Sequence, residues 1–510
     1  MWLPLLLLLS LLLLIIKKIQ IRKKGKLPPG PPKLPILGNL HQLGALPHRS
    51  TWKLSKKHGP IMLLQLGAIP TIIVSSAETA REVLKTHDLD CCSRPPLAVP
   101  KRLSYNFLDI GFVPYGYYWR EMRKICVTEL FSMKRVQSFQ SVREDEVTFL
   151  INSISESANS GSLVNLSKEF FSLHASITFR IAFGKIFQGS ELDNDKLQKV
   201  VNEAKSMLGA FCASDFLPYF GWMIDWLTGF HRRLESSFNE LDDFFQKVID
   251  DHLNSGRTMQ EHEDIVDVLL RMERDQTENS AIQITKDHIK AILMDIFLAG
   301  IDTGALTMIW AMTELARKPT VMKKAQYEIR RCVGKKGKVT DNDVNQLLYL
   351  QMIIKETLRL HPPAVLLLPR ETVSQFKIGD YDVYPKTRIA VNVWAIGRDP
   401  DIWKNPEEFL PERFNNNPID FKGQHFELLP FGAGRRICPG MNMGTALIEL
   451  ALANLLYHFD WKLPSGGEID MEEEVTITVG KKSALNLMPI NYISEDDKIQ
   501  GVAAIQIGNF

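Results

Sequence analysis

The chain has 510 residues, of which 45% are hydrophobic, so it is long enough to bury a large core. Its 61 Lys and Arg residues nearly balance its 59 Asp and Glu residues, which leaves a formal net charge of +2. This balance argues against nucleic acid as a partner, because nucleic-acid-binding proteins carry a strongly basic surface. The six cysteines are scattered without the spacing of a disulfide framework, which is typical of a reducing compartment.

The N-terminal stretch, residues 1–16, is almost entirely Leu and Ile and predicts a membrane anchor helix. Six Lys and Arg residues follow the apolar run within residues 17–26, and none precedes it. A cleaved signal peptide, the alternative, would carry its positive charge before the apolar run. The positive-inside rule then predicts that the rest of the chain faces the cytoplasm.

Residues 17–38 form a basic and proline-rich segment, with five prolines between positions 27 and 35. Prolines at this density favour stiff polyproline II, so we expect a hinge between the anchor and a globular body. Residues 61–66 and 71–74 then predict a β-hairpin. Ser75 and Glu78 have the spacing of a capping box that opens a helix.

The stretch 93–118 is rich in Pro, Gly and aromatic residues and predicts a long loop. A helix is expected after it, with Trp119 and Arg123 one turn apart on a single face. An indole N–H beside a guanidinium can clamp a buried carboxylate, although a solvated Arg on an amphipathic helix is the simpler alternative. Residues 140–275 are helical in period, except at an aromatic segment, 215–227. That segment is either a partly buried connection or a contact with the membrane interface.

A long apolar helix is predicted from residue 285 or 286 to about Arg317. Gly300 lacks a side chain and Thr303 can hydrogen bond back to the carbonyl of residue 299, so both loosen the helix locally. Asp302 is costly in such a helix unless it is paired. A capped kink would explain the same residues without any catalytic role.

A further buried helix, residues 350–360, contains Glu356 and Arg359 at a spacing that brings them face to face. Arg413 supplies a second cation in the run Pro-Glu-Arg-Phe, and Arg370 follows a short apolar run. Residues 376–393 alternate apolar side chains around turn residues and predict a second small sheet.

The stretch around Cys438 reads Pro-Phe-Gly-Ala-Gly-Arg-Arg-Ile-Cys-Pro-Gly and precedes an apolar helix at about 443–456. Pro439 suits the first helical position, which predicts Cys438 at the N-cap, where backbone N–H groups and Arg436 favour a thiolate. One thiolate with no second Cys or His beside it cannot form a zinc site, but it suits a haem iron held by a single cysteinate. A buried free Cys in a Gly-rich helix entry is the alternative.

This stretch resembles the haem-binding signature of the cytochrome P450 family, on Phe431, Gly434, Arg436, Cys438 and Gly440 in order. Together with the proline hinge and the motifs above, the resemblance covers residues 28 to about 490 and is greatest to plant microsomal A-type members.

The resemblance implies a mainly α fold with small β-sheets, in which haem b lies between the long central helix and the Cys438 loop. It makes Cys438 the axial ligand of the haem iron, and assigns proton delivery to Asp302 and Thr303. The triad of Glu356, Arg359 and Arg413 would brace the Cys438 loop. This chain departs from the family pattern at Gly304, where a second Thr or Ser is usual. The implied contacts with the haem propionates are Trp119, Arg123, Arg370 and Arg436.

The implied function is monooxygenation of a small lipophilic substrate, using dioxygen and electrons from NADPH through a separate NADPH-cytochrome P450 reductase. The implied organisation is a catalytic domain at 39–490, held at the endoplasmic reticulum membrane by a single-pass anchor and facing the cytoplasm, with a disordered tail at 491–510. An electron-independent isomerase or dehydratase and a non-catalytic haem sensor are the alternatives. Neither needs the proton relay at Asp302 and Thr303.

Overall fold

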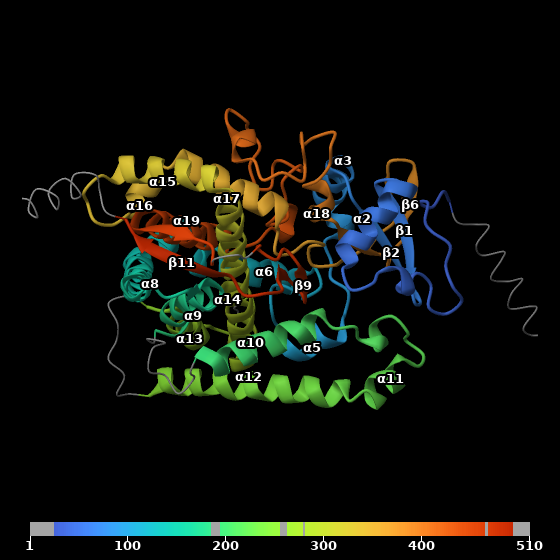
Figure 1. Cartoon of the computed structure of the whole chain (residues 1–510). Helices are drawn as coiled ribbons and strands as arrows, with labels where there is room; N and C mark the ends of the chain where they lie inside the picture. Colours follow the sequence, from blue (N-terminus) through green and yellow to red (C-terminus); the bar gives the residue numbers. More distant parts are fainter. Residues whose placement is uncertain (1–24, 185–193, 255–262, 279–280, 465–467, 493–510) are drawn as a thin grey trace, which may run out of the picture.

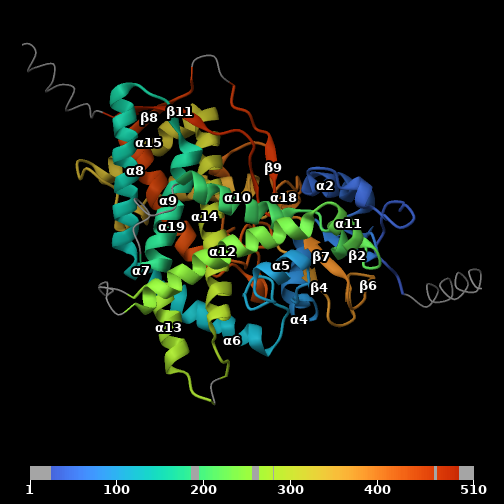
Figure 2. The same cartoon turned by 90° about the horizontal axis from the view of Figure 1, so that it is seen from below.

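The computed structural model describes residues 25–184, 194–254, 263–278, 281–464 and 468–492, and these are mainly helical, as the sequence predicts (Figures 1 and 2). The predicted anchor at 1–16 and residues 493–510 of the predicted tail lie outside the described residues. The α-helices are α2 (Pro47–His58), α3 (Ala77–Arg81), α4 (Asp88–Cys91), α5 (Ala98–Leu103), α6 (Tyr117–Ile125), α7 (Met133–Ser138), α8 (Gln140–Ser160), α9 (Leu166–Phe183), α10 (Asn194–Gly209), α11 (Gly221–Leu227), α12 (Phe230–Leu253), α13 (Ile265–Asp275), α14 (Lys286–Arg317), α15 (Pro319–Val333), α16 (Asp341–Val344), α17 (Leu348–Leu360), α18 (Val393–Ile396) and α19 (Met441–His458).

The strands are short and form small sheets. The largest has the order β1-β2-β7-β4, and the others pair β5 with β6, β9 with β10, and β11 with both β3 and β8. Their bounds are β1 (Ile61–Leu66), β2 (Ile69–Val74), β3 (Val164–Asn165), β4 (Arg370–Glu371), β5 (Phe376–Ile378), β6 (Tyr381–Val383), β7 (Arg388–Val391), β8 (Phe459–Lys462), β9 (Glu473–Val475), β10 (Val479–Lys481) and β11 (Asn486–Asn491).

The predicted N-terminal hairpin is confirmed. Strands β1 and β2 pair antiparallel, with Leu66 opposite Ile69, around a turn in which Gly67 has a positive φ of 58°. The capping prediction was wrong by one residue: the N-cap of α3 is Ser76, whose hydroxyl accepts from the Thr79 backbone N–H. Helix α3 opens one residue after the predicted start because the hairpin strand continues to Val74 and Ser75 closes it with a bond to the Pro60 carbonyl.

Helix α14 crosses the core and is the element on which the site is built (Figure 1). It begins at Lys286 and ends at Arg317, as predicted, and Thr285 caps it together with His288. It packs most extensively against α9, and also against α17 and α19. Among the described residues, α14 is the one helix long and apolar enough to cross a membrane. Since most of it is buried inside the protein, it is a core helix.

The described part of the predicted hinge lies against the globular body. The Leu63 N–H donates to the Pro29 carbonyl at 2.8 Å, and the Asp382 N–H donates to the Lys26 carbonyl at 2.7 Å. The segment therefore runs beside β1 and β6 at the end of the molecule that carries the largest sheet (Figure 1). Two segments predicted as irregular contain helices, because α5 lies inside 93–118 and α11 inside 215–227.

Candidate active site

The Cys438 loop turns sharply before α19. Gly432 and Gly434 have positive φ values of 69° and 70°, and a Cβ on Gly434 would lie 2.2 Å from the Leu84 carbonyl oxygen, so only glycine fits there. The Cys438 N–H donates to the Phe431 carbonyl at 3.0 Å and closes the loop.

Cys438 is not the N-cap that the sequence predicts, because α19 begins at Met441 with Gly440 as its N-cap. Pro439 lies in the turn before the helix. The sulfur still meets the helix end, since backbone hydrogen bonds from Gly440 and Met441 stabilise the thiolate. Burial raises the pKa of the Cys438 thiol, and these N–H groups and the nearby Arg123 oppose that shift.

The Cys438 side chain is solvent-accessible even though protein surrounds it on several sides, whereas Cys91, Cys92, Cys126 and Cys212 are buried. Ala299 and Gly300 of α14 are likewise accessible, in a helix whose other residues are mostly buried. The accessible thiol precedes α19 and the accessible turn lies in α14, and these two helices pack against each other.

The turn 299–303 has the predicted geometry. The Thr303 hydroxyl donates to the Ala299 carbonyl at 2.9 Å. Asp302 is 4% exposed and is paired, as its burial requires. Its carboxylate bonds to the Lys205 ammonium of α10 and accepts from the Thr478 hydroxyl at 2.6 Å. Asp302 thus ties α14 to α10 and to the turn between β9 and β10.

The two predicted propionate contacts on α6 already have protein partners. The Trp119 indole N–H donates to the Ile110 carbonyl at 3.2 Å, and the Arg123 guanidinium donates to the Ile437 carbonyl. Arg123 therefore reaches the residue next to Cys438, while Trp119 holds the loop 108–113.

The other two predicted arginines also engage protein groups. Arg370 pairs with Asp88 at 2.6 Å and donates to the Ala433 carbonyl. Arg436 lies over the Trp119 ring at 4.3 Å and donates to three backbone carbonyls, among them that of Val113 at 2.6 Å. Burial, together with the nearby Arg370, lowers the pKa of Arg436 to about 10.

Sequence reasoning missed Arg94, which completes this cluster. Its guanidinium donates to the carbonyls of Gly111, Leu368 and Pro369. Burial, followed by the charges of Arg436 and Arg370, lowers the pKa of Arg94 well below its usual range. No local pattern marks it, because its partners lie up to 275 positions away.

The predicted triad is present and buried. Arg359 pairs with Glu356 through two bonds of 2.7 and 2.8 Å, and Arg413 donates to the same carboxylate at 2.9 Å. Arg359 also donates to carbonyls of the segment 397–408 that leads toward the Cys438 loop. The triad therefore fixes the backbone of this segment, and its bracing of the Cys438 loop stays a prediction.

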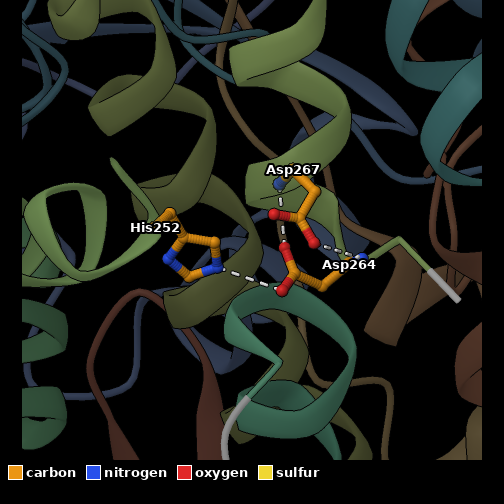
Figure 3. A group of neighbouring side chains, drawn as sticks. All are labelled: His252, Asp264 and Asp267. Atoms are coloured by element: carbon orange, nitrogen blue, oxygen red, sulfur yellow. Dashed lines mark hydrogen bonds and ion pairs between the residues drawn. The ribbon is translucent and has the colours of Figure 1, made fainter. Parts of the chain in front are cut away.

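A second group of titratable side chains consists of His252 of α12 and of Asp264 and Asp267 at the start of α13 (Figure 3). Asp264 is the N-cap of α13, and its side chain and that of Asp267 form a capping box. The two ring nitrogens of His252 bond to the Val248 carbonyl at 2.6 Å and to Asp264 at 3.0 Å. These bonds make the group a helix cap.

The comparisons with known proteins agree with the resemblance seen in the sequence. A sequence model of the family described as "Cytochrome P450" matches residues 28–488. Cytochrome P450 71B36 of Arabidopsis thaliana is 56% identical over 469 residues, covering 91% of this chain and 93% of that protein. Cytochrome P450 71B10 of the same plant is 55% identical over 492 residues, covering 95% and 98%. A zebra fish cytochrome P450 structure with abiraterone shares the fold, with a TM-score of 0.75 at 24% identity over 88% of this chain and 100% of that one.

The fold and the family match define a haem-dependent oxidoreductase of the haem-thiolate class. The chain belongs to the cytochrome P450 family. It is therefore a monooxygenase, and its cofactor is haem b.

The residues present fit haem b on two observations. An accessible thiol, Cys438, and an accessible turn of small residues, Ala299 and Gly300, lie on or beside two helices that pack against each other. Nearby, the guanidinium groups of Arg94, Arg123, Arg370 and Arg436 outnumber the carboxylates that face them, so the donor set suits an added dicarboxylate such as the two haem propionates.

Proposed function

We propose that the protein inserts one atom of dioxygen into a small lipophilic metabolite, with electrons from NADPH delivered by a separate NADPH-cytochrome P450 reductase. Haem b, when bound, supplies the oxygen-activating chemistry. The observation that carries the proposal is the accessible Cys438 thiol, held by backbone N–H groups at the start of α19.

Cys438 would hold the iron of haem b through its thiolate sulfur. A thiolate ligand would supply electron density that favours cleavage of the O–O bond. Arg123 of α6 supports the thiolate, because its guanidinium donates to the Ile437 carbonyl and opposes the rise in the Cys438 pKa.

Trp119, Arg123, Arg370 and Arg436 are the proposed propionate contacts, and Arg94 joins them. Each already bonds to protein, so the cluster is positioned before any ligand arrives. Since each guanidinium has five N–H donors, the arginines retain donors for a carboxylate, whereas the single indole N–H of Trp119 would have to leave the Ile110 carbonyl to bind one. Preorganised donors cost little reorganisation on binding.

Thr303 and Asp302 are proposed to deliver protons. The Thr303 hydroxyl donates its hydrogen to the Ala299 carbonyl. The lone pairs of its oxygen remain available to accept from a water molecule. Asp302 connects through Lys205 to a surface hollow of about 670 Å³ lined by Lys205 and other residues of α10. The Asp302–Lys205 ion pair therefore connects the buried carboxylate of α14 with the hollow at the protein surface.

The proposed location is the cytoplasmic face of the endoplasmic reticulum, with a single-pass anchor at 1–16. Two exposed apolar segments support contact with a membrane: residues 34–37, and residues 219–227, where Tyr219 is 88% and Trp226 70% exposed. Both flank one hairpin turn, since the Gly67 N–H donates to the Leu37 carbonyl and the Ala68 N–H to the Phe216 carbonyl.

Reconstitution tests the function. The full-length protein is combined with a plant NADPH-cytochrome P450 reductase, and a library of lipophilic plant metabolites is screened for a shift of the haem absorption band. We expect a hit to give NADPH consumption matched by an oxygenated product. Conversion of the hit without NADPH would indicate an isomerase or dehydratase, and a band shift with no turnover at all would indicate a sensor.

A further inference from the structure

Three successive residues just after α5 have a left-handed backbone. Tyr105, Asn106 and Phe107 have positive φ values of 52°, 62° and 68°, and none of them is glycine. Residues with a Cβ adopt this conformation singly and at a cost in free energy, so a run of three persists only where the surrounding contacts fix it. The turn is therefore strained, and its position depends on the contacts that hold it.

The Tyr105 side chain holds this turn against two helices. Its hydroxyl donates to the Asp242 carboxylate of α12 at 2.6 Å, and the Lys290 ammonium of α14 donates to the same oxygen at 2.6 Å. Lys290 is 6% exposed, so the ion pair is largely withdrawn from water. The Tyr105 ring also packs against Phe238 of α12, with the ring centroids 5.1 Å apart. Tyr105 thus ties the end of α5 to α12, beside which α5 lies (Figures 1 and 2), and through Asp242 to α14.

The strained turn leads directly into a loop whose carbonyls hold two of the clustered arginines. Arg436 donates to the carbonyls of Ile110 and Val113 at 3.1 and 2.6 Å, and Arg94 donates to that of Gly111 at 2.9 Å. A guanidinium is planar, so the carbonyls that bind some of its N–H groups also set where its other N–H groups point. The path of the loop therefore determines how both arginines are oriented.

We propose that Tyr105 is a positioning residue for the haem propionate contacts. It acts through the backbone: its bond to Asp242 fixes the left-handed turn, the turn fixes the start of the loop, and the loop carbonyls orient Arg94 and Arg436. The proposal rests on the proposed role of these arginines as propionate contacts. It assigns Tyr105 no chemical step.

The first test measures how firmly the haem-loaded full-length protein holds its cofactor. Transfer of haem to an excess of apomyoglobin is followed by absorption for the wild type and for Tyr105→Phe, which keeps the ring and removes the hydroxyl. We expect transfer to be about tenfold faster in the variant, as loss of one hydrogen bond to a carboxylate produces. The propionate bending bands of the resonance Raman spectrum should shift, and hydrogen exchange in peptides covering 104–116 should be faster.

Tyr349→Phe is the matched control. The Tyr349 hydroxyl donates to the Glu412 carboxylate at 2.7 Å, and Lys324 donates to the same oxygen at 2.6 Å, so this variant removes the same kind of bond outside the loop. Haem transfer, the Raman bands and exchange in 104–116 should all match the wild type. Equal acceleration of haem transfer in both Tyr variants, or none in Tyr105→Phe, would overturn the proposal.

The second test changes the strained turn at Asn106, whose side chain is exposed. Asn106→Gly suits a positive φ and should keep the wild-type rate of haem transfer. Asn106→Val places a β-branched residue in the left-handed region and should accelerate transfer by about tenfold or more. Equal rates in the Gly and Val variants would show that the left-handed turn does not control haem retention and would contradict the proposal.

Arg436→Gln distinguishes a failure of this proposal from a failure of the propionate contacts on which it rests. It should accelerate haem transfer, because it removes a proposed contact. Unchanged transfer in Arg436→Gln would refute the propionate role of this arginine, and with it the basis of the present proposal. Accelerated transfer in Arg436→Gln but not in Tyr105→Phe would refute the role of Tyr105 alone.

Discussion

At the residue scale, the site depends on how the fold sets the charge of a few side chains. The Cys438 thiol is raised in pKa by burial and stabilised as thiolate by Arg123 and two backbone N–H groups. Asp302 remains buried because Lys205 and Thr478 satisfy it. Thr303 is different, since its hydroxyl has one fixed bond and remains accessible. It is therefore the side chain best placed to hold water at the turn.

Thr303→Ala tests that role. Haem content and the substrate-induced band shift should be preserved, because the variant leaves Cys438 and the arginines intact. Product formation should fall by about 10²–10⁴-fold, the usual contribution of a positioned proton donor, while NADPH is still consumed and peroxide appears. Thr307→Ala is the control: its hydroxyl makes the same kind of bond, to the Thr303 carbonyl at 2.9 Å, but it is buried. Unchanged coupling in Thr303→Ala would limit this residue to helix geometry.

At the element scale, Asp295 of α14 joins the loop 104–116 to that helix, and Asp109 bonds within the loop itself. Asp295 accepts from the N–H groups of Ile110 and Gly111, and Asp109 accepts from that of Phe112. Burial raises the pKa of Asp109 to about 6. Burial, and then the charge of Asp109, raises the pKa of Asp295 well above its usual range. The same loop is held by Trp119, Arg94 and Arg436, so it is fixed from several sides.

These shifts predict a pH dependence. An unfolded Asp titrates near pH 4 and the folded pair titrates higher, so above pH 4 the folded state binds more protons than the unfolded state. The contribution of the Asp109–Asp295 pair to the free energy of unfolding is complete below about pH 4. It is lost as the pH rises through the pKa values of the pair in the folded protein. Asp295→Asn cannot titrate and keeps an acceptor for the loop. Its free energy of unfolding, relative to wild type, should therefore improve as the pH rises from 4 to 8.

Asp295→Ala is the matched control in urea unfolding. It leaves the Ile110 and Gly111 N–H groups without an acceptor and should be about 1–3 kcal/mol less stable than Asp295→Asn throughout this pH range, because neither variant titrates at position 295. A constant difference between wild type and Asp295→Asn at all pH values would mean that the carboxyl pair does not titrate as described.

A feature of this structure can be predicted from the sequence when its cause lies within a single helix, strand or turn. The bounds of α14, the Thr303 back-bond and the pairing of Glu356 with Arg359 follow from spacing within one element, and each was correct. Errors arose where neighbouring elements shift a boundary, as at Ser76, or where a turn delays a helix, as at Gly440.

Other features were out of reach for the same reason. Arg94, Lys205 and His174 contact residues that are distant in the sequence. No local sequence pattern identifies them. Gly304 was visible as a departure from the family pattern, but the His174 ring that fills the space beside it lies on α9 and could not be seen in the sequence. Long-range contacts of this kind depend on tertiary packing, which single-chain patterns do not encode.

At the scale of the whole molecule, apolar side chains gather at the end that carries the largest sheet. Residues 34–37 and the helix α11 lie beside the turn of the β1–β2 hairpin, and both figures place α11 near this end (Figures 1 and 2). Trp222, Trp226 and Leu227 are more than half exposed. Of the two interpretations of the segment 215–227, this exposure favours contact with a membrane interface.

Vesicle binding checks this surface. A protein lacking residues 1–24 should keep its fold and still bind phosphatidylcholine vesicles weakly in a flotation assay. Trp226→Ser combined with Leu227→Ser should abolish most of that residual binding without changing the melting temperature, because both side chains are exposed. Tyr327→Ser on α15 is the control, since Tyr327 is similarly exposed and lies outside the patch. Equal loss of binding in both variants would contradict a specific membrane face.

The central claim, that Cys438 is the thiolate ligand of the haem, is tested most directly by the absorption spectrum of the ferrous carbon-monoxide complex. The wild-type protein should show the red-shifted band that a thiolate ligand produces, and so should Cys332→Ser, which alters a partly exposed thiol elsewhere. Cys438→Ser replaces the thiolate with a hydroxyl that does not ionise at neutral pH and should lose the band. Retention of the red-shifted band in Cys438→Ser would show that another cysteine holds the iron and would contradict this assignment of the site.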